Sequence, residues 1–280
     1  MERELLGKAV VEKIDLETMA EQEKLKIEGK DKTLAILRVG EKPDDIYYEN
    51  SAIKKAEKLG IDAKRVTLSG DATQQKIEDA IIELNNDSSV AGVLILRPLP
   101  KTVDEELLIN MLDPNKDIDG ITDISMARTY ADKKGFAPCT AKAVMEMLKF
   151  YEVEIEGKNI VVLGRSLVIG KPVSMMLTKE NGTVTICHSK TKNLPEVVRS
   201  ADIVVSSMGR AKMLTAEYFS QGQTVIDVGI NQDENGNMCG DIDFEQAKDM
   251  VKEITPVPRG IGAVTTSILM QHLVEAASKS

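Results

Sequence analysis

Short apolar runs alternate with longer amphipathic stretches along the whole chain. In the first half, the apolar runs at 32–40, 61–69 and 90–100 are typical of buried strands. Capping residues and glycines delimit the amphipathic stretches between them, and helices are predicted at 47–60, 71–87 and 102–112. Regular alternation of strands with helices predicts βαβ units and a parallel sheet.

A second alternating set follows residues 113–140, which are polar, irregular and punctuated by glycine. We expect this segment to be a connector that carries function rather than a packed element. Strands are then predicted near 159–163, 183–187, 202–206, 223–228 and 253–256, and helices near 141–151, 170–180, 194–200, 215–221, 243–251 and 265–280.

The economical interpretation is an α/β fold of two lobes with a cleft between them. The first domain covers 1–119 and is completed by the last helix, 265–280. A connector covers 120–140. The second domain, 141–264, is expected to be a Rossmann-like, doubly wound lobe.

Composition excludes several classes of function. Apolar residues make up 42% and charged residues 29% of the chain, which is ordinary for a globular protein. The formal net charge is −9 and tryptophan is absent, whereas a nucleic-acid binder normally has a basic face and stacking aromatic side chains. No apolar run is long enough to span a membrane, and the N-terminus lacks a signal-peptide core. We therefore expect a cytoplasmic protein that binds neither nucleic acid nor membrane.

Cysteine and histidine usage argues against a metal site. Cys139, Cys187 and Cys239 lie about fifty residues apart, without the close spacing typical of a zinc site. His188 and His272 are the two histidines of the chain, which are too few for a histidine-rich metal centre. The sequence predicts three reduced thiols and no bound metal.

The stretch "VVLGRSLVIGKP", residues 161–172, lies where a predicted strand meets a predicted helix. A helix N-terminus offers free backbone N–H groups and a partial positive charge, so phosphate groups bind there. Gly164 would let the backbone turn tightly, and Gly170 would let the helix approach the strand. We interpret the stretch as a dinucleotide-binding loop, and a plain structural turn is the alternative.

The next predicted strand ends in "TICHSKTKN", which in such a fold lies beside the adenosine ribose. A site for NAD usually places a carboxylate there, but here Ser189, Lys190 and Lys192 follow the strand, with Arg165 in the neighbouring loop. An arginine binds a 2′-phosphate well, so the residues favour NADP over NAD. A solvated basic turn is the alternative.

Several motifs occur together: "YYENSAIKKAEKLGI", "LRPLP", "DIDGI", "GRSLVIGKP", "TICHSKTKNL", "VIDVGIN", "GDIDFE" and "ITPVPRGIGAVT". In order and spacing they resemble the methylenetetrahydrofolate dehydrogenase/cyclohydrolase family over essentially the whole chain. The resemblance implies an N-terminal folate-binding lobe, a C-terminal NADP-binding lobe, tetrahydrofolate derivatives as substrates, and a homodimer.

The resemblance also implies site residues. Tyr48 would stack on the folate, and Asp119 would accept hydrogen bonds from the pterin N–H groups. Pro258, Gly260 and Gly262 would belong to a loop that closes over nicotinamide and folate. The cofactor set is Gly164, Arg165, Ser166, Gly170, Ser189 and Ile230. Taken alone, Tyr48 could be a packing residue and Asp119 a turn residue.

Two departures from the family pattern concern catalysis. The pattern has a lysine four residues after the tyrosine, where this chain has Ala52, and a glutamine before the Pro-Leu-Pro segment, where it has Leu96. Hydrolysis of methenyl-tetrahydrofolate needs proton transfer, which a lysine with a tuned pKa provides and an alanine does not. Hydride transfer depends mainly on positioning and on the cofactor.

Neither of the nearby lysines is well placed to substitute. Lys54 is expected on another face of the helix, and Lys55 about two turns along the axis. Strand alternation sends Arg97 to the opposite side from Leu96. Arg259 and Ala263 also differ from a glycine and a proline of the family pattern.

We therefore expect an NADP-dependent 5,10-methylenetetrahydrofolate dehydrogenase with weak or absent cyclohydrolase activity. Two alternatives stay open. One is a fully bifunctional enzyme, in which another residue or a water replaces the lysine. The other is a non-catalytic scaffold that binds folate and nucleotide.

Overall fold

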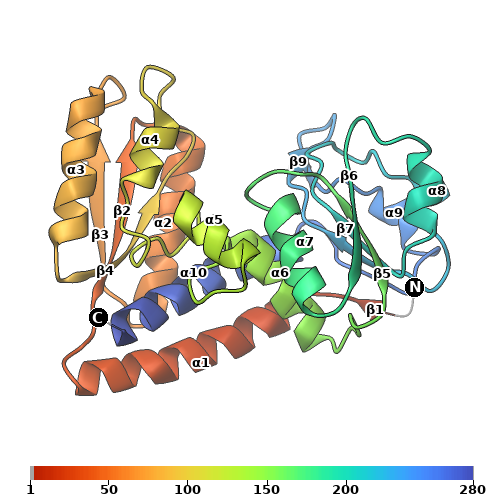
Figure 1. The fold of residues 1–280 in the computed structure, drawn as a ribbon, viewed down its shortest axis with the longest axis horizontal. Helices are drawn as coiled ribbons and strands as arrows, with labels where there is room; N and C mark the ends of the chain where they lie inside the picture. Colours follow the sequence, from red (N-terminus) through yellow and green to blue (C-terminus); the bar gives the residue numbers. More distant parts are fainter. Residues whose placement is uncertain (1–2, 280) are drawn as a thin grey trace. The chain divides into compact units, whose positions relative to one another are not determined.

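The computed structural model describes residues 3–279 and divides into two units (Figure 1). The N-terminal unit comprises residues 13–139 and 266–279, and the C-terminal unit comprises residues 3–12 and 140–265. Two long helices, α1 (Gly7–Ile27) and α10 (Ile261–Ser278), contribute residues to both units.

The N-terminal unit is built on a parallel sheet with the strand order β3-β2-β4. Its strands are β2 (Thr33–Val39), β3 (Ala63–Leu68) and β4 (Val90–Ile95), and its further helices are α2 (Pro43–Lys58), α3 (Gln74–Asn86), α4 (Glu105–Asn110) and α5 (Asp123–Tyr130). Helices α3 and α4 pack their apolar side chains on one face of the sheet. Helix α2 lies on the other face, where Glu49 contacts Arg38 of β2.

A glycine in β4 lets the last helix approach the sheet. A Cβ on Gly92 would lie 2.5 Å from Ile118 and 2.9 Å from Leu273 of α10. Any larger residue would therefore push both neighbours away from the strand. This close packing fixes the position of Ile118, and thereby of Asp119, which follows it.

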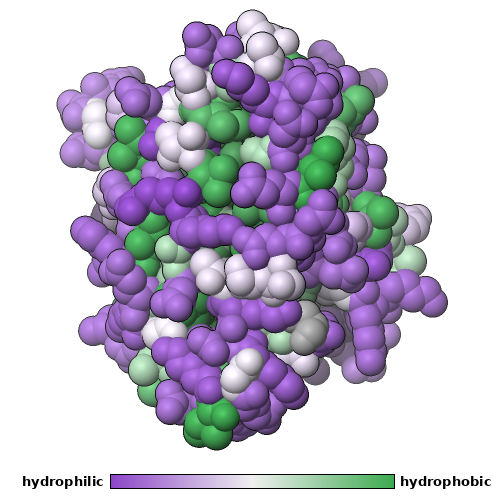
Figure 2. Space-filling view, turned by 90° about the vertical axis from the view of Figure 1, so that its left-hand side faces the viewer, coloured by the Kyte–Doolittle hydropathy of each residue, from purple (hydrophilic) through white to green (hydrophobic). Residues whose placement is uncertain are grey.

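The side of the N-terminal unit that carries α3 is mostly hydrophilic, with apolar side chains in separate spots (Figure 2). Such a surface is expected of an amphipathic covering helix. In α3 the buried residues Ile77, Ile81 and Leu84 are spaced by three or four positions, and the rest of the helix is mainly polar.

The C-terminal unit contains a six-stranded parallel sheet with the order β1-β11-β8-β7-β5-β6. Its strands are β1 (Arg3–Glu4), β5 (Asn159–Leu163), β6 (Thr183–Cys187), β7 (Ile203–Ser206), β8 (Thr224–Asp227) and β11 (Glu253–Ile254). Its further elements are α6 (Cys139–Phe150), α7 (Gly170–Lys179), α8 (Leu194–Arg199), the 3₁₀ turn η1 (Ala216–Tyr218), α9 (Phe244–Ala247) and the hairpin strands β9 (Asn231–Gln232) and β10 (Met238–Cys239).

The predicted α/β class with parallel sheets is confirmed, but several local predictions are wrong. Helix α5 lies inside the predicted connector, where Thr122 caps it by accepting the N–H of Ser125 at 3.2 Å. Only Ser125 of this helix is buried, so its sequence lacks the apolar periodicity from which a helix could be predicted. The predicted helices at 215–221 and 243–251 shorten to η1 and α9.

The N-terminal segment also differs from the expected domain boundary. Residues 3–12 belong to the C-terminal unit, because β1 pairs with β11 and Leu5 N–H donates to Ile254 O at 2.9 Å. Helix α1 was not predicted, since its buried side includes Asp15, Thr18 and Gln22, which interrupt the apolar pattern.

Within residues 3–279, no helix combines the length and the apolar character that crossing a membrane requires. The cytoplasmic location stays a prediction.

Candidate active site

The loop between β5 and α7 requires glycine at both predicted positions. Gly164 has a φ of +124°, and a Cβ there would lie 2.5 Å from Ser207 O. A Cβ on Gly170 would lie 2.2 Å from Gly164 O. Both contacts are far too short, so the turn closes only with glycine. The result is a tight strand-to-helix turn at the N-terminus of α7, which is the geometry that holds a pyrophosphate.

Ser166 shapes this loop from within. Its hydroxyl accepts the N–H of Ile169 at 3.2 Å, and its carbonyl accepts the N–H of Lys171 at 3.0 Å. The serine therefore folds the loop onto the first turn of α7.

Arg165 and Ser189 follow neighbouring strands. Leu163 lies opposite Cys187 in the parallel pairing of β5 and β6, so the segments beyond them leave the sheet side by side. Arg165 and Ser189 each stand two positions beyond that pair, and both are exposed. In the part of the chain that the structure describes, Arg165 has no ion-pair partner. An unpaired guanidinium at this edge suits a phosphate group.

Ile230 and the loop at 258–262 also belong to the C-terminal unit. Ile230 is 65% exposed, and its Cδ1 would lie 3.6 Å from a Cβ on Gly262. A Cβ on Gly260 would lie 2.6 Å from Pro256 O, so this position needs glycine. Pro258 is exposed. The predicted roles of Pro258, Gly260 and Gly262 against the substrate stay predictions.

In the N-terminal unit, the structure brings Tyr48 and Asp119 together with Cys139. Besides burial, the charges of Asp119 and Cys139 both raise the pKa of the Tyr48 hydroxyl, and the Thr266 side chain of α10 lowers it. The Cys139 thiol donates to Ile118 O at 3.3 Å. The Asp119 carbonyl also accepts the Cys139 N–H at 3.3 Å. Tyr48 and Asp119 are partly buried, and Cys139 is buried.

Burial makes the three groups hard to ionise. It raises the pKa of Asp119 to about 7, and the neighbouring Asp117 carboxylate adds to that effect. The Cys139 thiol and the Arg97 charge act in the opposite direction on the pKa of Asp119. Burial also raises the pKa of Tyr48 and of Cys139 well above their ordinary values. The pKa of Asp119 is thus close to neutral pH, so its carboxyl group changes its protonation state in that range.

The two residues that depart from the family pattern are apolar and buried. Ala52 lies one helical turn after Tyr48 on α2 and is 0% exposed. Leu96 directly follows β4 and is 6% exposed, and its N–H donates to Leu37 O at 2.9 Å. Neither position offers a group that could transfer a proton.

Two charged neighbours of these positions, Lys55 and Arg97, are engaged in ion pairs. Lys54 is exposed. Lys55 Nζ lies 2.6 Å from Asp15 Oδ2, and the Asp15 carboxylate also accepts the Ser267 hydroxyl at 3.0 Å. Arg97 pairs with Glu105 at 2.8 Å. A lysine held by a largely buried carboxylate is a structural ion pair and not a free base.

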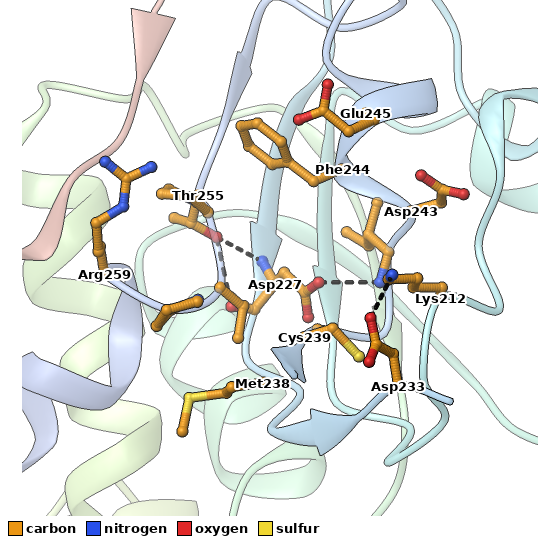
Figure 3. Close-up of a pocket in the computed structure, with 15 residues that line it drawn as sticks. Lys212, Asp227, Asp233, Met238, Cys239, Asp243, Phe244, Glu245, Thr255 and Arg259 are labelled. Carbon is orange, nitrogen blue, oxygen red and sulfur yellow. Dashed lines mark hydrogen bonds and ion pairs between the residues drawn. The ribbon is translucent and has the colours of Figure 1, made fainter. Parts of the chain in front are cut away.

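A pocket of about 310 Å³ lies in the C-terminal unit beside the ends of β8 and β11 (Figure 3). Asp227 lies on its wall, where burial raises the pKa of its carboxyl group to about 7, and Asp227 accepts the N–H groups of Gly229 and Ile242, both at 2.9 Å. Lys212 and Arg259 stand on opposite sides of the pocket in Figure 3. Lys212 pairs with Asp233 at 3.0 Å.

Arg259 occupies a strained position. Its φ is +87°, a conformation that costs a residue with a side chain about 1–3 kcal/mol. Its guanidinium lies 3.8 Å from the Glu4 carboxylate and is mostly exposed. Nothing in the structure explains why an arginine stands there.

The sequence missed Cys139, Thr266 and His272 as neighbours of the Tyr48 and Asp119 pair. They come from the start of α6 and from α10, far along the chain from α2, and no motif links them. Among residues 3–279, no cluster of three or more His, Cys, Asp or Glu side chains is arranged to hold a metal ion.

The parallel sheet, its crossover helices and the loop with two obligatory glycines define an α/β protein that binds a dinucleotide. Comparison with known families agrees. Residues 138–280 match the model of the tetrahydrofolate dehydrogenase/cyclohydrolase NAD(P)-binding domain, and residues 5–119 match that of the catalytic domain. The chain therefore belongs to the tetrahydrofolate dehydrogenase/cyclohydrolase family.

Relatives cover the chain from end to end. The bifunctional protein FolD of Clostridium botulinum is 46% identical over 100% of both chains. The structure of the bifunctional enzyme FolD from Campylobacter jejuni has a TM-score of 0.97 at 36% identity and covers 99% of each chain. The enzyme of Trypanosoma brucei, solved with NADP and an inhibitor, has a TM-score of 0.92 at 32% identity and covers 98% of this chain and 96% of its own.

These comparisons confirm the predicted family and the expected class of cofactor. The predicted homodimer and the individual site residues stay predictions.

Proposed function

We propose that the chain is an NADP-dependent 5,10-methylenetetrahydrofolate dehydrogenase with weak or absent methenyltetrahydrofolate cyclohydrolase activity. The observation that carries the proposal is that Ala52 and Leu96 are both apolar and buried, while the predicted residues Tyr48 and Asp119 are present. The family pattern places the proton-transferring lysine and its glutamine partner at these two positions.

The residues present fit the dinucleotide. The glycines at 164 and 170 permit the tight turn before α7, because a Cβ at either position would collide with backbone, and Arg165 supplies an exposed cation for the 2′-phosphate. When bound, NADP supplies the acceptor for the hydride. The chain itself orients the substrate, since Tyr48 would stack on the folate rings and Asp119 would accept hydrogen bonds from the pterin N–H groups.

Hydrolysis makes a different demand on the site. Water must be deprotonated at the attacked carbon and a proton must be returned, and positioned general catalysts typically contribute roughly 10²- to 10⁴-fold to such steps. Of the two titratable residues predicted for this site, Tyr48 has a raised pKa that keeps it protonated, and Asp119 is assigned to the pterin. Hydride transfer involves no proton transfer by a residue at position 52 or 96, so the loss of the lysine and the glutamine does not remove a catalytic group from that step.

A fully bifunctional enzyme is the second candidate, and the names of the relatives favour it. The Clostridium botulinum and Campylobacter jejuni proteins are both called bifunctional. Under this alternative, a water or a residue other than Ala52 activates the hydrolytic step.

The proposed activity is tested by mixing the protein with NADP and 5,10-methylenetetrahydrofolate and following absorbance of the reduced nicotinamide. We expect absorbance to rise in proportion to the amount of protein. A scaffold that only binds its ligands would produce no change in absorbance at any protein concentration.

The preference for NADP depends on Arg165. Replacing Arg165 with alanine should raise the KM for NADP by roughly ten-fold or more, about the effect of one charge-assisted phosphate contact. Use of NAD should change little, because NAD lacks the 2′-phosphate. Lys179→Ala, at the far end of α7, serves as a control for loss of a positive charge. An equal effect of Arg165→Ala on both cofactors would show that the arginine does not contact the 2′-phosphate.

A further inference from the structure

The N-terminal half of α2, which carries Tyr48, buries almost no apolar surface. Of residues 43–50, Glu49 is the only one that is buried, and the apolar residues that α2 buries begin at Ala52. The helix also starts without a side-chain cap at Lys42. Burial of an apolar face is what normally holds a helix on a sheet. The position of this half of α2, and of Tyr48 with it, therefore depends on the contacts of Glu49.

Glu49 forms a buried ion pair with Arg38 of β2. Its Oε2 accepts the Arg38 Nε–H at 3.0 Å, and the Arg38 guanidinium, which is largely buried, also donates to Gly40 O. Arg65 lies farther away, 3.8 Å from the same oxygen, and is half exposed. Among residues 3–279, Glu49 Oε1 has no hydrogen-bond partner. Arg38 therefore provides most of the compensation for a carboxylate whose burial would otherwise be costly.

The ion pair connects α2 to the sheet beside Leu96. Leu37 pairs with Ile95 in the parallel ladder of β2 and β4, and the Leu96 N–H continues the ladder by donating to Leu37 O at 2.9 Å. Leu37 and Ile95 belong to the core on the α3 side of the sheet. Because side chains alternate along a strand, Arg38 and Leu96 project from the opposite face, on which α2 lies. On the helix, the ion pair is formed three residues before Ala52.

We propose that Arg38 and Glu49 are positioning residues for Tyr48. The ion pair fixes the N-terminal half of α2 on the sheet, and the tyrosine that directly precedes Glu49 is thereby held where it can stack on the folate. This inference rests on the proposed role of Tyr48 in binding folate. Lys42 donates to Pro98 O at 2.8 Å, but this contact is exposed to water and holds the start of α2 only weakly.

The test separates positioning from stability by removing the pair in two ways. Arg38→Met alone leaves a buried carboxylate without its partner, and we expect the Tm to fall by roughly 10 °C or more. The double variant Arg38→Met, Glu49→Leu replaces the whole pair with apolar side chains, a change that is often neutral or stabilising. We expect the double variant to melt near the wild-type temperature and yet to use 5,10-methylenetetrahydrofolate poorly.

The kinetic readout is kcat/KM for 5,10-methylenetetrahydrofolate. In the double variant it should fall by roughly ten-fold or more, because a displacement of about 1 Å in the site can cost as much as 10²-fold. NADP binding should not change, since the cofactor loop belongs to the other unit. Arg38→Lys keeps a charged donor for Glu49 and should retain most of the activity. Wild-type kinetics in the double variant, or an equally large loss in Arg38→Lys, would overturn the proposal.

The ion pair in the C-terminal half of α2 provides a matched control. Lys55 Nζ lies 2.6 Å from Asp15 Oδ2, and both side chains are largely buried. The variant Lys55→Met, Asp15→Asn removes this pair, keeps an acceptor for the Ser267 hydroxyl, and should leave kcat/KM unchanged. An equal loss in the control would show that any weakening of α2 affects the substrate, and the particular role of Arg38 and Glu49 would be wrong.

The position of Tyr48 can also be followed without any substrate. In protein labelled with 3-fluorotyrosine, the fluorine NMR signal of Tyr48 is assigned with Tyr48→Phe. It should shift or broaden in Arg38→Met, Glu49→Leu and stay unchanged in the Lys55→Met, Asp15→Asn control. A fall in kcat/KM with an unchanged signal would mean that the pair acts on the substrate directly, and the positioning role would be wrong.

The same measurements separate this inference from the proposed function. If the Tyr48 signal changes as expected while the wild-type protein neither binds tetrahydrofolate nor reduces NADP, the role of the pair stands and the proposed function fails. If the wild-type protein is active and neither the signal nor kcat/KM changes in the double variant, the proposed function stands and the inference fails.

Discussion

Methenyl-tetrahydrofolate mixed with the wild-type protein is expected to decay at close to the rate in buffer alone. The position one turn after Tyr48 is a fully buried alanine, and the residue after β4 is a buried leucine, so the site holds no proton carrier there. Loss of general acid–base catalysis removes roughly 10²- to 10⁴-fold in rate. The measurement is the decay of methenyl absorbance at catalytic concentrations of protein, beside the NADP reduction assay on the same preparation.

Restoring the two side chains should restore part of the hydrolysis. The double variant Ala52→Lys, Leu96→Gln is expected to accelerate methenyl decay clearly above the buffer rate. Ala52→Lys alone should do less, because a buried ammonium without a hydrogen-bonding partner is costly and poorly oriented. The single variant should also melt at a lower temperature than wild type.

A matched control is Ser51→Lys, which adds a lysine at the neighbouring exposed position of α2 and should leave methenyl decay unchanged. Brisk hydrolysis by the wild-type protein would instead support the bifunctional alternative. It would show that a group other than the side chains at positions 52 and 96 catalyses the hydrolysis.

The sequence was informative wherever a local rule applied. Glycines at 164 and 170 could be placed in a strand-to-helix turn because only that residue tolerates the close approach of backbone, and the structure shows contacts of that kind at both. Strands such as β2 and β4 are continuous apolar runs, which identify a buried parallel sheet without any knowledge of its neighbours.

The parts that could not be predicted depend on contacts between distant segments. Helix α1 buries Asp15 because Lys55 and Ser267 satisfy its carboxylate, and neither partner can be inferred from the sequence around Asp15. The environment of Asp119 is similar, since His272 lies 154 residues from Ile118 along the chain. Local patterns identify a carboxylate, but its pKa is set by what the fold packs around it.

Asp119→Asn is expected to weaken folate binding and, at the same time, to stabilise the free protein above neutral pH. Asparagine keeps one acceptor but presents N–H groups where the pterin also presents N–H groups, at a cost of order 1–3 kcal/mol in binding. NADP binding to the free enzyme should not change, because Asp119 belongs to the N-terminal unit and the cofactor loop to the C-terminal unit. Calorimetry with each ligand measures both effects.

The gain in stability follows from the raised pKa. Burial holds the pKa of Asp119 at about 7 in the folded protein, against an ordinary value of about 3.9 in the unfolded chain. The folded state therefore binds the proton more tightly, and the stability contributed by this group is complete below pH 4 and lost as pH rises toward and through 7. The full difference corresponds to an upper limit of about 4 kcal/mol at alkaline pH. An asparagine does not ionise, so the variant does not lose this free energy of unfolding as the pH rises.

Asp227 provides the contrasting case, because burial gives its carboxyl group the same raised pKa of about 7. Its two oxygens accept the N–H groups of Gly229, Asp241 and Ile242, so Asp227→Asn would set an amide N–H against backbone donors. Thermal unfolding at pH 8 should show a higher Tm for Asp119→Asn and a lower one for Asp227→Asn. A lower Tm for Asp119→Asn, with folate and NADP binding both reduced, would mean that Asp119 holds the fold together rather than the substrate.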